Sequence, residues 1–194
     1  MMKPGPLITG EWIVFAISWI AASGWSSAVD RRLGMKREAL YRVILIAGGL
    51  IMGVPSHGYQ GPLRLWFVSR DEAWCCVAVI ALGFVFAWWA RIHLGELWSS
   101  QITAKANHRV VDTGPYSLVR HPIYTGILLS VYATAAAKGT VLAIVGAVII
   151  TLGIWMKARL EEAWLSTQLE PDAYLRYRRL VPMLIPFGPK MQGG

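Results

Sequence analysis

Two basic residues stand directly before an apolar stretch in the segment GPYSLVRHPIYTG, residues 114–126. The Gly-Pro pair is a turn signal, and Pro122 suits the first position of a helix, where its missing N–H costs nothing. His121 is therefore predicted near the N-cap. Free N–H groups at a helix N-terminus favour negative charge, and the planar guanidinium of Arg120 suits a carboxylate. The segment predicts either an anion and ligand site or a helix start with two polar residues that reach the membrane surface.

Two adjacent carboxylates, Glu161 and Glu162, directly follow a later apolar stretch. The helix dipole disfavours negative charge near the C-terminal end of a helix, so the pair needs a reason to lie there. One reason is structural, because the helix can continue and Lys157 and Glu161 are spaced for an ion pair on it. The other is functional, with the pair facing the Arg-His-Pro segment and binding a cationic ligand. The residues alone leave both open.

The last candidate segment is AYLRYRRLVPMLIPF, residues 173–187, in which Tyr and Arg alternate with apolar residues. It is typical of an amphipathic segment with its Arg on lipid headgroups, and equally of a lid over the site; the two are compatible. His93, His108 and His121 match no zinc-ligand spacing, so no metal site is predicted. The chain also has no glycine-rich phosphate loop, no G-x-S-x-G and no H-E-x-x-H motif.

Composition assigns these segments to a membrane protein. The 194 residues are 55% hydrophobic and 15% charged, whereas a soluble domain has roughly a quarter charged residues. We predict one all-α domain, 1–194, with about five transmembrane helices. These are expected at 7–29, 40–55, 73–92, 122–137 and 140–157. The first has no basic n-region and is expected to be retained.

The last two predicted spans are separated by only two residues, which predicts a tight antiparallel hairpin. Small residues in both, among them Gly126, Gly146 and Gly153, are typical of positions where membrane helices approach closely.

The distribution of basic residues gives an orientation. With the N-terminus outside, the segments 30–42, 91–121 and 157–194 are cytosolic and hold five, four and six Lys and Arg, fifteen of the nineteen. This asymmetry is what the positive-inside rule requires. The net charge of +8 is then explained by orientation and anionic lipid, and a nucleic-acid partner is not needed. The Arg-His-Pro segment and the tail both lie on the cytosolic face.

Three sequence segments follow one another along the chain: VDTGPYSLVRHPIYTG, then RLEEAWL after the predicted hairpin, then AYLRYRRLVPMLIPF. This order resembles the isoprenylcysteine carboxyl methyltransferase family, which is itself related to the phospholipid methyltransferases. The resemblance covers about residues 93–187. It implies an integral membrane enzyme that methylates the C-terminal α-carboxylate of a prenylated cysteine, converting S-adenosylmethionine to S-adenosylhomocysteine. Residues 1–72, with the first two spans, match no motif, so the catalytic part is expected within 73–194.

The resemblance also implies the site residues. Arg120, with Glu161 or Glu162, is expected at the reaction centre, and the C-terminal segment is expected to close over the cofactor. The cofactor contacts it implies are Lys105, His108, Val110, Gly114, Tyr116, Ser117, Leu118, His121, Tyr124, Tyr174, Tyr177 and Arg178. An ionised carboxylate is already nucleophilic, so in-line methyl transfer requires orientation rather than a strong base. A prenyl tail is expected to reach the site from the lipid, past the hairpin or past Trp88 and Trp89.

Three alternatives stay open at this point. A phospholipid N-methyltransferase would methylate a neutral amine and need a base, which a Glu can supply. The C-terminal part of membrane sterol reductases, which use NADPH, is also similar. A small helical transporter subunit or scaffold without enzymatic activity is the third.

Overall fold

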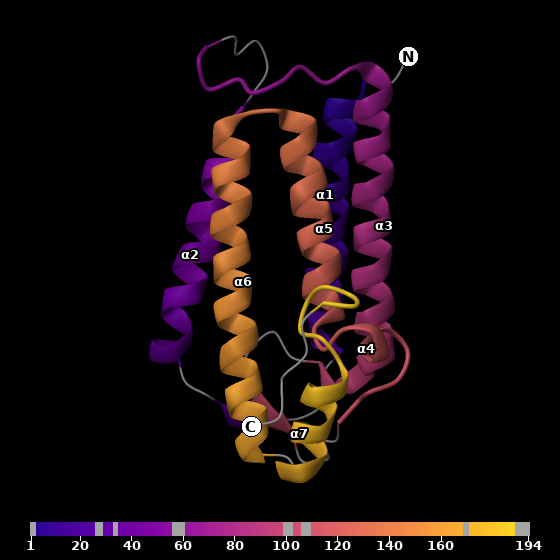
Figure 1. Cartoon of the computed structure of the whole chain (residues 1–194), viewed down its shortest axis with the longest axis vertical. Helices are drawn as coiled ribbons and strands as arrows, with labels where there is room; N and C mark the ends of the chain where they lie inside the picture. Colours follow the sequence, from indigo (N-terminus) through magenta and orange to yellow (C-terminus); the bar gives the residue numbers. More distant parts are fainter. Residues whose placement is uncertain are drawn as a thin grey trace.

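The computed structural model describes residues 3–25, 29–32, 35–55, 61–98, 103–105, 110–168 and 171–188. Within these ranges the chain is almost entirely helical, as predicted. The long helices are α1 Pro4–Ala21, α2 Met35–Gly53, α3 Arg70–Leu94, α5 Pro122–Lys138 and α6 Val141–Gln168. Along the chain their directions alternate, so that they form one elongated antiparallel bundle (Figure 1).

Short elements close the two ends of the bundle. At one end, called the site end here, lie α4 Pro115–Leu118 and α7 Pro171–Leu180 (Figure 1). Two 3-10 turns, η1 Ala22–Gly24 and η2 Gly95–Leu97, follow α1 and α3, and β1 Val29–Arg32 pairs antiparallel with β2 Thr103–Lys105. At the opposite end, called the turn end, Gly139 and Thr140 join α5 to α6. The backbone of residues 63–66 covers this turn, for example through Leu65 N–H to the Gly139 carbonyl at 2.8 Å.

Three helices in the described part of the chain are long and apolar enough to cross a membrane: Pro4–Gly24, Arg70–Leu94 and Val141–Thr167. The other two long helices fall short for different reasons. α5 has only 17 residues, and α2 begins with the charged run Lys36, Arg37 and Glu38.

Several predicted boundaries were wrong. α1 ends at Ala21 instead of continuing to 29, because Ser and Gly follow and the chain tightens into η1. α3 starts earlier than predicted because Ser69 and Glu72 form a capping box at its N-terminus. α6 continues to Gln168, past the predicted end of the membrane span at 157, which is the continuing helix that the structural explanation of the acid pair expected. The acid pair is thus part of this helix and does not follow it.

Glycines join the long helices in two tight pairs. A Cβ on Gly83 of α3 would lie 2.6 Å from the Gly126 carbonyl oxygen of α5. In the same way, a Cβ on Gly146 of α6 would lie 2.8 Å from the Gly48 carbonyl oxygen of α2. Contacts this short exclude any side chain, so the backbones touch. The close approach predicted for Gly126 and Gly146 is confirmed, but each packs on a different helix, not on the other.

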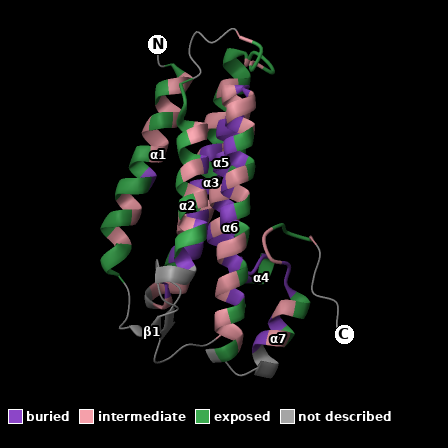
Figure 2. Ribbon diagram, turned by 90° about the vertical axis from the view of Figure 1, so that its left-hand side faces the viewer, coloured by how far each residue is buried: buried purple, intermediate pink, exposed green. Residues whose placement is uncertain are grey.

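α1 packs against the outer surface of the α3–α5 pair. Figure 2 shows it mostly exposed or intermediate, while buried residues gather on α3, α5 and α6. Phe15 stacks on Phe84 with ring centroids 4.2 Å apart. At the site end the buried Arg91 of α3 donates to the carbonyls of Ala22 and Trp25 at 3.1 and 2.6 Å. This arginine therefore fixes the end of α1 against α3.

Candidate active site

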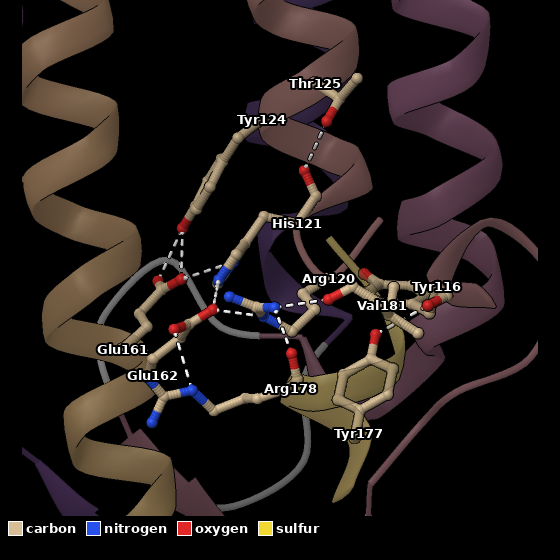
Figure 3. Close-up of polar contacts among 10 residues, drawn as sticks. All are labelled: Tyr116, Arg120, His121, Tyr124, Thr125, Glu161, Glu162, Tyr177, Arg178 and Val181. Carbon is tan, nitrogen blue, oxygen red and sulfur yellow. Dashed lines mark hydrogen bonds and ion pairs between the residues drawn. The ribbon is translucent and has the colours of Figure 1, made fainter. Parts of the chain in front are cut away.

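A buried ion pair between Arg120 and Glu162 forms the centre of the site. Arg120 Nε lies 2.6 Å from Glu162 Oε1, and both side chains are almost fully buried. His121 Nε2 lies 3.2 Å from the same carboxylate oxygen. His121 is the N-cap of α5 and Pro122 its first residue, as predicted. The start of α5 thereby delivers two cationic or polar side chains to the acid on α6 (Figure 3).

The C-terminal segment 178–184 is bound to this same corner. The Arg120 guanidinium donates through Nη1 to the carbonyls of Arg178, at 3.0 Å, and Val181. Residues 120, 121 and 125 make three further hydrogen bonds to the segment: Arg120 N–H to Pro182 O at 2.9 Å, His121 N–H to Met183 O at 3.1 Å and Thr125 Oγ1 to Leu184 O at 2.6 Å. The backbone N–H groups of residues 120 and 121, which directly precede the first residue of α5, therefore bond to the C-terminal segment.

The second acid, Glu161, belongs to a separate group of contacts. The Tyr124 hydroxyl lies 2.6 and 2.8 Å from its two carboxylate oxygens and donates to them. Lys157 Nζ lies 3.7 Å from Glu161 and 5.3 Å from the centre of the Tyr124 ring. His121 Nδ1 is 3.7 Å from Glu161, so this imidazole lies between the two acids.

Buried tyrosines form the wall beside α4 and α7. The Tyr177 hydroxyl donates to the Tyr116 carbonyl at 2.8 Å, which ties α7 to α4. Tyr174 and Tyr177 pack with Val181 and with the partly buried Val110. Burial raises the pKa of the Tyr116, Tyr174 and Tyr177 phenols, so all three are neutral at physiological pH.

Two buried polar atoms in the cluster lack a hydrogen bond to any described residue. They are Glu162 Oε2 and Arg178 Nε, which face each other across 3.4 Å. Buried polar atoms in proteins are nearly always hydrogen-bonded. Glu162 Oε2 can therefore accept, and Arg178 Nε can donate, a hydrogen bond to the charged groups of a polar ligand.

Most of the predicted site residues come together at the site end. Arg120, His121, Tyr124, Glu161, Glu162, Tyr116, Tyr177 and Arg178 form the contacts drawn in Figure 3, and Tyr174 and Val110 pack behind α7. Three others lie elsewhere on α4. Gly114 is its N-cap, with a positive φ of 57°, and lies against the His93 ring. Ser117 and Leu118 are exposed.

Two of the predicted cofactor contacts, Lys105 and His108, involve side chains outside the described part of the chain. Lys105 belongs to β2 but its side chain is outside the described part, and His108 is outside the described residues. Sequence reasoning missed Thr125 altogether and treated Lys157 only as a structural partner of Glu161. A hydroxyl four residues after an N-cap gives no signal of its own, because its partner, Leu184, is distant in the chain.

The family follows from comparison with known proteins. The sequence model described as phospholipid methyltransferase matches residues 72–171, which is more than half of the 194 residues. The chain therefore belongs to the phospholipid methyltransferase family. The match runs from α3 to the start of α7, and so contains the acid pair and the Arg-His-Pro segment but neither α1 nor α2.

Three curated relatives show what the chain resembles. The cobalt-zinc-cadmium resistance protein CzcN of Cupriavidus metallidurans is 27% identical over 169 residues, 84% of this chain and 70% of that protein. The protein-S-isoprenylcysteine O-methyltransferase of Schizosaccharomyces pombe is 31% identical over 106 residues, 52% of this chain and 43% of that protein. The nickel-cobalt-cadmium resistance protein NccN of Alcaligenes xylosoxydans xylosoxydans is 29% identical over 99 residues, 50% of this chain and 40% of that protein. The chain thus matches less than half the length of the last two.

Family membership and the apolar helices together define the class: this is a membrane methyltransferase. The names of two relatives refer to metal resistance, which is a property of those proteins. Within the described ranges of this chain, no three His, Cys, Asp or Glu side chains are grouped as metal ligands.

Proposed function

We propose that the protein transfers a methyl group from S-adenosylmethionine to the C-terminal carboxylate of a prenylated cysteine. The observation that carries this proposal is the buried cluster of Arg120, His121 and Glu162, where Glu162 keeps one carboxylate oxygen without a hydrogen bond. The cluster lies at the end of helices apolar enough for a membrane. A substrate with a charged end and a hydrocarbon tail suits this position. The isoprenylcysteine methyltransferase relative supports the choice of acceptor.

The residues fit the charges of the cofactor. When bound, S-adenosylmethionine supplies an electrophilic methyl group on a positively charged sulfur, and it also carries an ammonium and a carboxylate. Glu162 Oε2 suits the ammonium and Arg178 Nε the carboxylate, since both are buried without a hydrogen-bond partner in the described part of the chain. The neighbouring tyrosine rings suit a cationic or aromatic group. We assign cofactor binding to these residues and to the segment that Arg120 holds.

The two acids then have different roles. Glu162 is enclosed by Arg120, His121 and Arg178, so it positions the arginines and binds cofactor. Glu161 keeps 18% of its side chain exposed and contacts Tyr124 and Lys157. We assign Glu161 to the acceptor side of the site.

We assign two cations, Arg120 and Lys157, to the acceptor carboxylate. Arg120 uses Nε and Nη1 within the protein, so only Nη2 is left for a ligand in the described structure. Lys157 lies over the Tyr124 ring on the acceptor side. An ionised carboxylate held by these groups requires no base, and the chain's contribution is orientation and exclusion of water.

A phospholipid amine is the second candidate acceptor. One observation favours it: Glu161 lies beside His121 and is a carboxylate placed where an amine must lose a proton. In that reaction Glu161 acts as the base and Lys157 faces the lipid phosphate.

The experiment uses the purified protein in nanodiscs with S-adenosylmethionine labelled in its methyl group. N-acetyl-S-farnesylcysteine and phosphatidylethanolamine are offered separately. We expect label in a base-labile methyl ester of the first acceptor. Label only in the phospholipid would replace our first candidate by the second, and label in neither, from protein that binds S-adenosylhomocysteine, would contradict both.

A further inference from the structure

α2 lies along α6 in a fixed antiparallel register (Figure 1). A Cβ on Gly48 of α2 would lie 2.8 Å from the Ile150 side chain of α6. Nearer the site end, a Cβ on Gly153 of α6 would lie 2.8 Å from the Leu45 side chain of α2. Residues four apart share one face of a helix. The next turn of α2, four residues before Leu45, therefore lies beside the next turn of α6, four residues after Gly153.

The residue that α6 contributes to this turn is Lys157, whose ammonium lies near tyrosine rings from two other helices. Its Nζ is 5.9 Å from the centre of the Tyr41 ring on α2 and 5.3 Å from that of the Tyr124 ring on α5. The same atom is 3.7 Å from Glu161. A cation within about 6 Å of the centre of an aromatic ring is attracted to the ring face. Only 16% of the Lys157 side chain is exposed, so these contacts restrict where the ammonium can lie.

Buried contacts at the start of α2 fix the Tyr41 ring. Its hydroxyl donates to Glu38 Oε2 at 2.9 Å, and Arg42 forms an ion pair with the same oxygen. Tyr41 and Glu38 are both buried. Burying a carboxylate is costly unless it keeps hydrogen-bonding and charged partners, so Tyr41 cannot turn away from Glu38 without a loss of stability. The ring is therefore held in place beside the Lys157 ammonium.

We propose that Tyr41 is a positioning residue of the acceptor site, which holds Lys157 beside Glu161 and Tyr124 for the anionic group of the acceptor. The inference rests on the proposed function, because Lys157 is assigned there to that group. It extends the site to α2, which lies outside residues 72–171, the range that the family model matches. A helix in which the sequence shows no functional motif thereby completes the site.

Tyr41 acts through Lys157, so it affects the binding of the acceptor more than the chemical step. A lysine side chain is flexible, and without the Tyr41 ring its ammonium has more positions open to it. The negative charge of the acceptor is fully present when the acceptor binds and is no larger in the transition state. Loss of the ring therefore raises KM and leaves kcat nearly unchanged.

The first experiment is a double-mutant cycle on the acceptor kinetics. The wild type, Tyr41→Leu, Lys157→Met and the double variant are assayed in nanodiscs with labelled S-adenosylmethionine and N-acetyl-S-farnesylcysteine. We expect Tyr41→Leu to raise KM for the acceptor about tenfold and to change kcat less than about twofold. In the Lys157→Met background the same substitution should change KM less than about twofold. An unchanged KM, an equal rise of KM in both backgrounds, or a fall of kcat alone would overturn the proposal.

Further variants separate the ring from the hydroxyl and from folding. Tyr41→Phe keeps the ring and loses the donor to Glu38, so it should keep a KM closer to that of the wild type than to that of Tyr41→Leu. Tyr132→Leu removes an exposed tyrosine of α5 and should behave as the wild type. If Tyr41→Leu does not fold, Tyr41→Met replaces it, because Met adapts to irregular space without a ring. Equal losses in Tyr41→Phe and Tyr41→Leu would contradict a role of the ring.

A second experiment needs no turnover. The purified protein in nanodiscs is treated with N-acetoxysuccinimide, and acetylation of Lys157 is followed by mass spectrometry relative to the exposed Lys3. We expect Tyr41→Leu to accelerate acetylation of Lys157 at least about threefold, because the ring no longer holds the ammonium, and Tyr132→Leu to leave the rate unchanged. An unchanged rate in Tyr41→Leu would overturn the inference. Faster acetylation in a protein that methylates neither acceptor would instead contradict the proposed function alone.

Discussion

Arg120 and Glu162 form a buried ion pair, Nε to Oε1 at 2.6 Å, and Arg120 also binds the carbonyls of Arg178 and Val181. One guanidinium thereby joins the start of α5, the site end of α6 and the C-terminal segment. Its first role is to hold the site together. In the proposed reaction, only its remaining nitrogen, Nη2, contacts the acceptor.

Breaking this ion pair should destabilise the fold as well as the site. Arg120→Met leaves the Glu162 charge buried without its main partner, for which we expect a loss of about 3–5 kcal/mol. Adding Glu162→Gln removes that charge, so the double variant should be more stable than the sum of the two single effects. The free energy of unfolding, measured by denaturant titration in mixed micelles, tests this. If the two substitutions had additive effects on the free energy of unfolding, Arg120 and Glu162 would not stabilise each other.

The Tyr124 hydroxyl should matter for the acceptor and not for the fold. Tyr124→Phe removes the donor to Glu161 and keeps the ring. A hydrogen bond to a charged group contributes about 1.5–3 kcal/mol, so kcat/KM for the acceptor should fall about tenfold or more. Tyr132→Phe is the matched control on the same helix, because that hydroxyl contacts Thr151 on an exposed face. An equal loss of kcat/KM in both variants would show that the hydrogen bond from Tyr124 to Glu161 has no specific role in the reaction.

The Tyr177 hydroxyl should matter for the cofactor. Tyr177→Phe leaves the buried Tyr116 carbonyl without its donor, at a cost of about 1–3 kcal/mol, and loosens α7 from α4. We expect weaker binding of S-adenosylhomocysteine, measured by calorimetry. Burial raises the pKa of Tyr177 above the ordinary value, so the phenol stays a neutral donor and the difference should be constant between about pH 6 and 9. A difference that disappears within this interval would contradict the assignment.

The sequence predicted local features of the site, such as where a helix starts, better than the contacts between segments distant in the chain. The start of α5 follows from local rules, because Pro122 favours a first helical position and His121 then becomes the N-cap. Small residues mark where helices touch, but they do not say which helix they touch. That is why Gly126 and Gly146, expected within one hairpin, pack on α3 and α2.

The connections that escaped prediction are non-local. The backbone hydrogen bonds of Arg120 and His121 end on Pro182 and Met183, about sixty residues later, and no local pattern encodes such a partner. Sequence analysis left open whether the helix of the fifth predicted span continues past residue 157, where its apolar pattern stops. The helix continues to Gln168, and Arg120, the ion-pair partner of its Glu162, is again distant in the chain.

The orientation of the bundle is a separate proposal. From the positive-inside distribution we propose that the site end lies in the cytosol and that all five long helices cross the membrane, α2 and α5 as well as the three that are long and apolar enough by themselves. Green fluorescent protein fused after the last residue should fluoresce, because it folds in the cytosol. A fusion after Pro55, at the turn end, should stay dark. The reverse pattern would invert the orientation.

The most direct test of the central claim is binding of S-adenosylhomocysteine to the purified protein, by calorimetry, in the wild type and in Arg178→Ala and Glu162→Gln. The control is Val85→Ala, on an exposed face of α3. We predict that the wild type and the control bind equally, and that each cluster variant binds at least tenfold more weakly while remaining folded. Folded wild-type protein that does not bind, or cluster variants that bind as tightly as the control, would contradict the assignment of this cluster to the methyl donor.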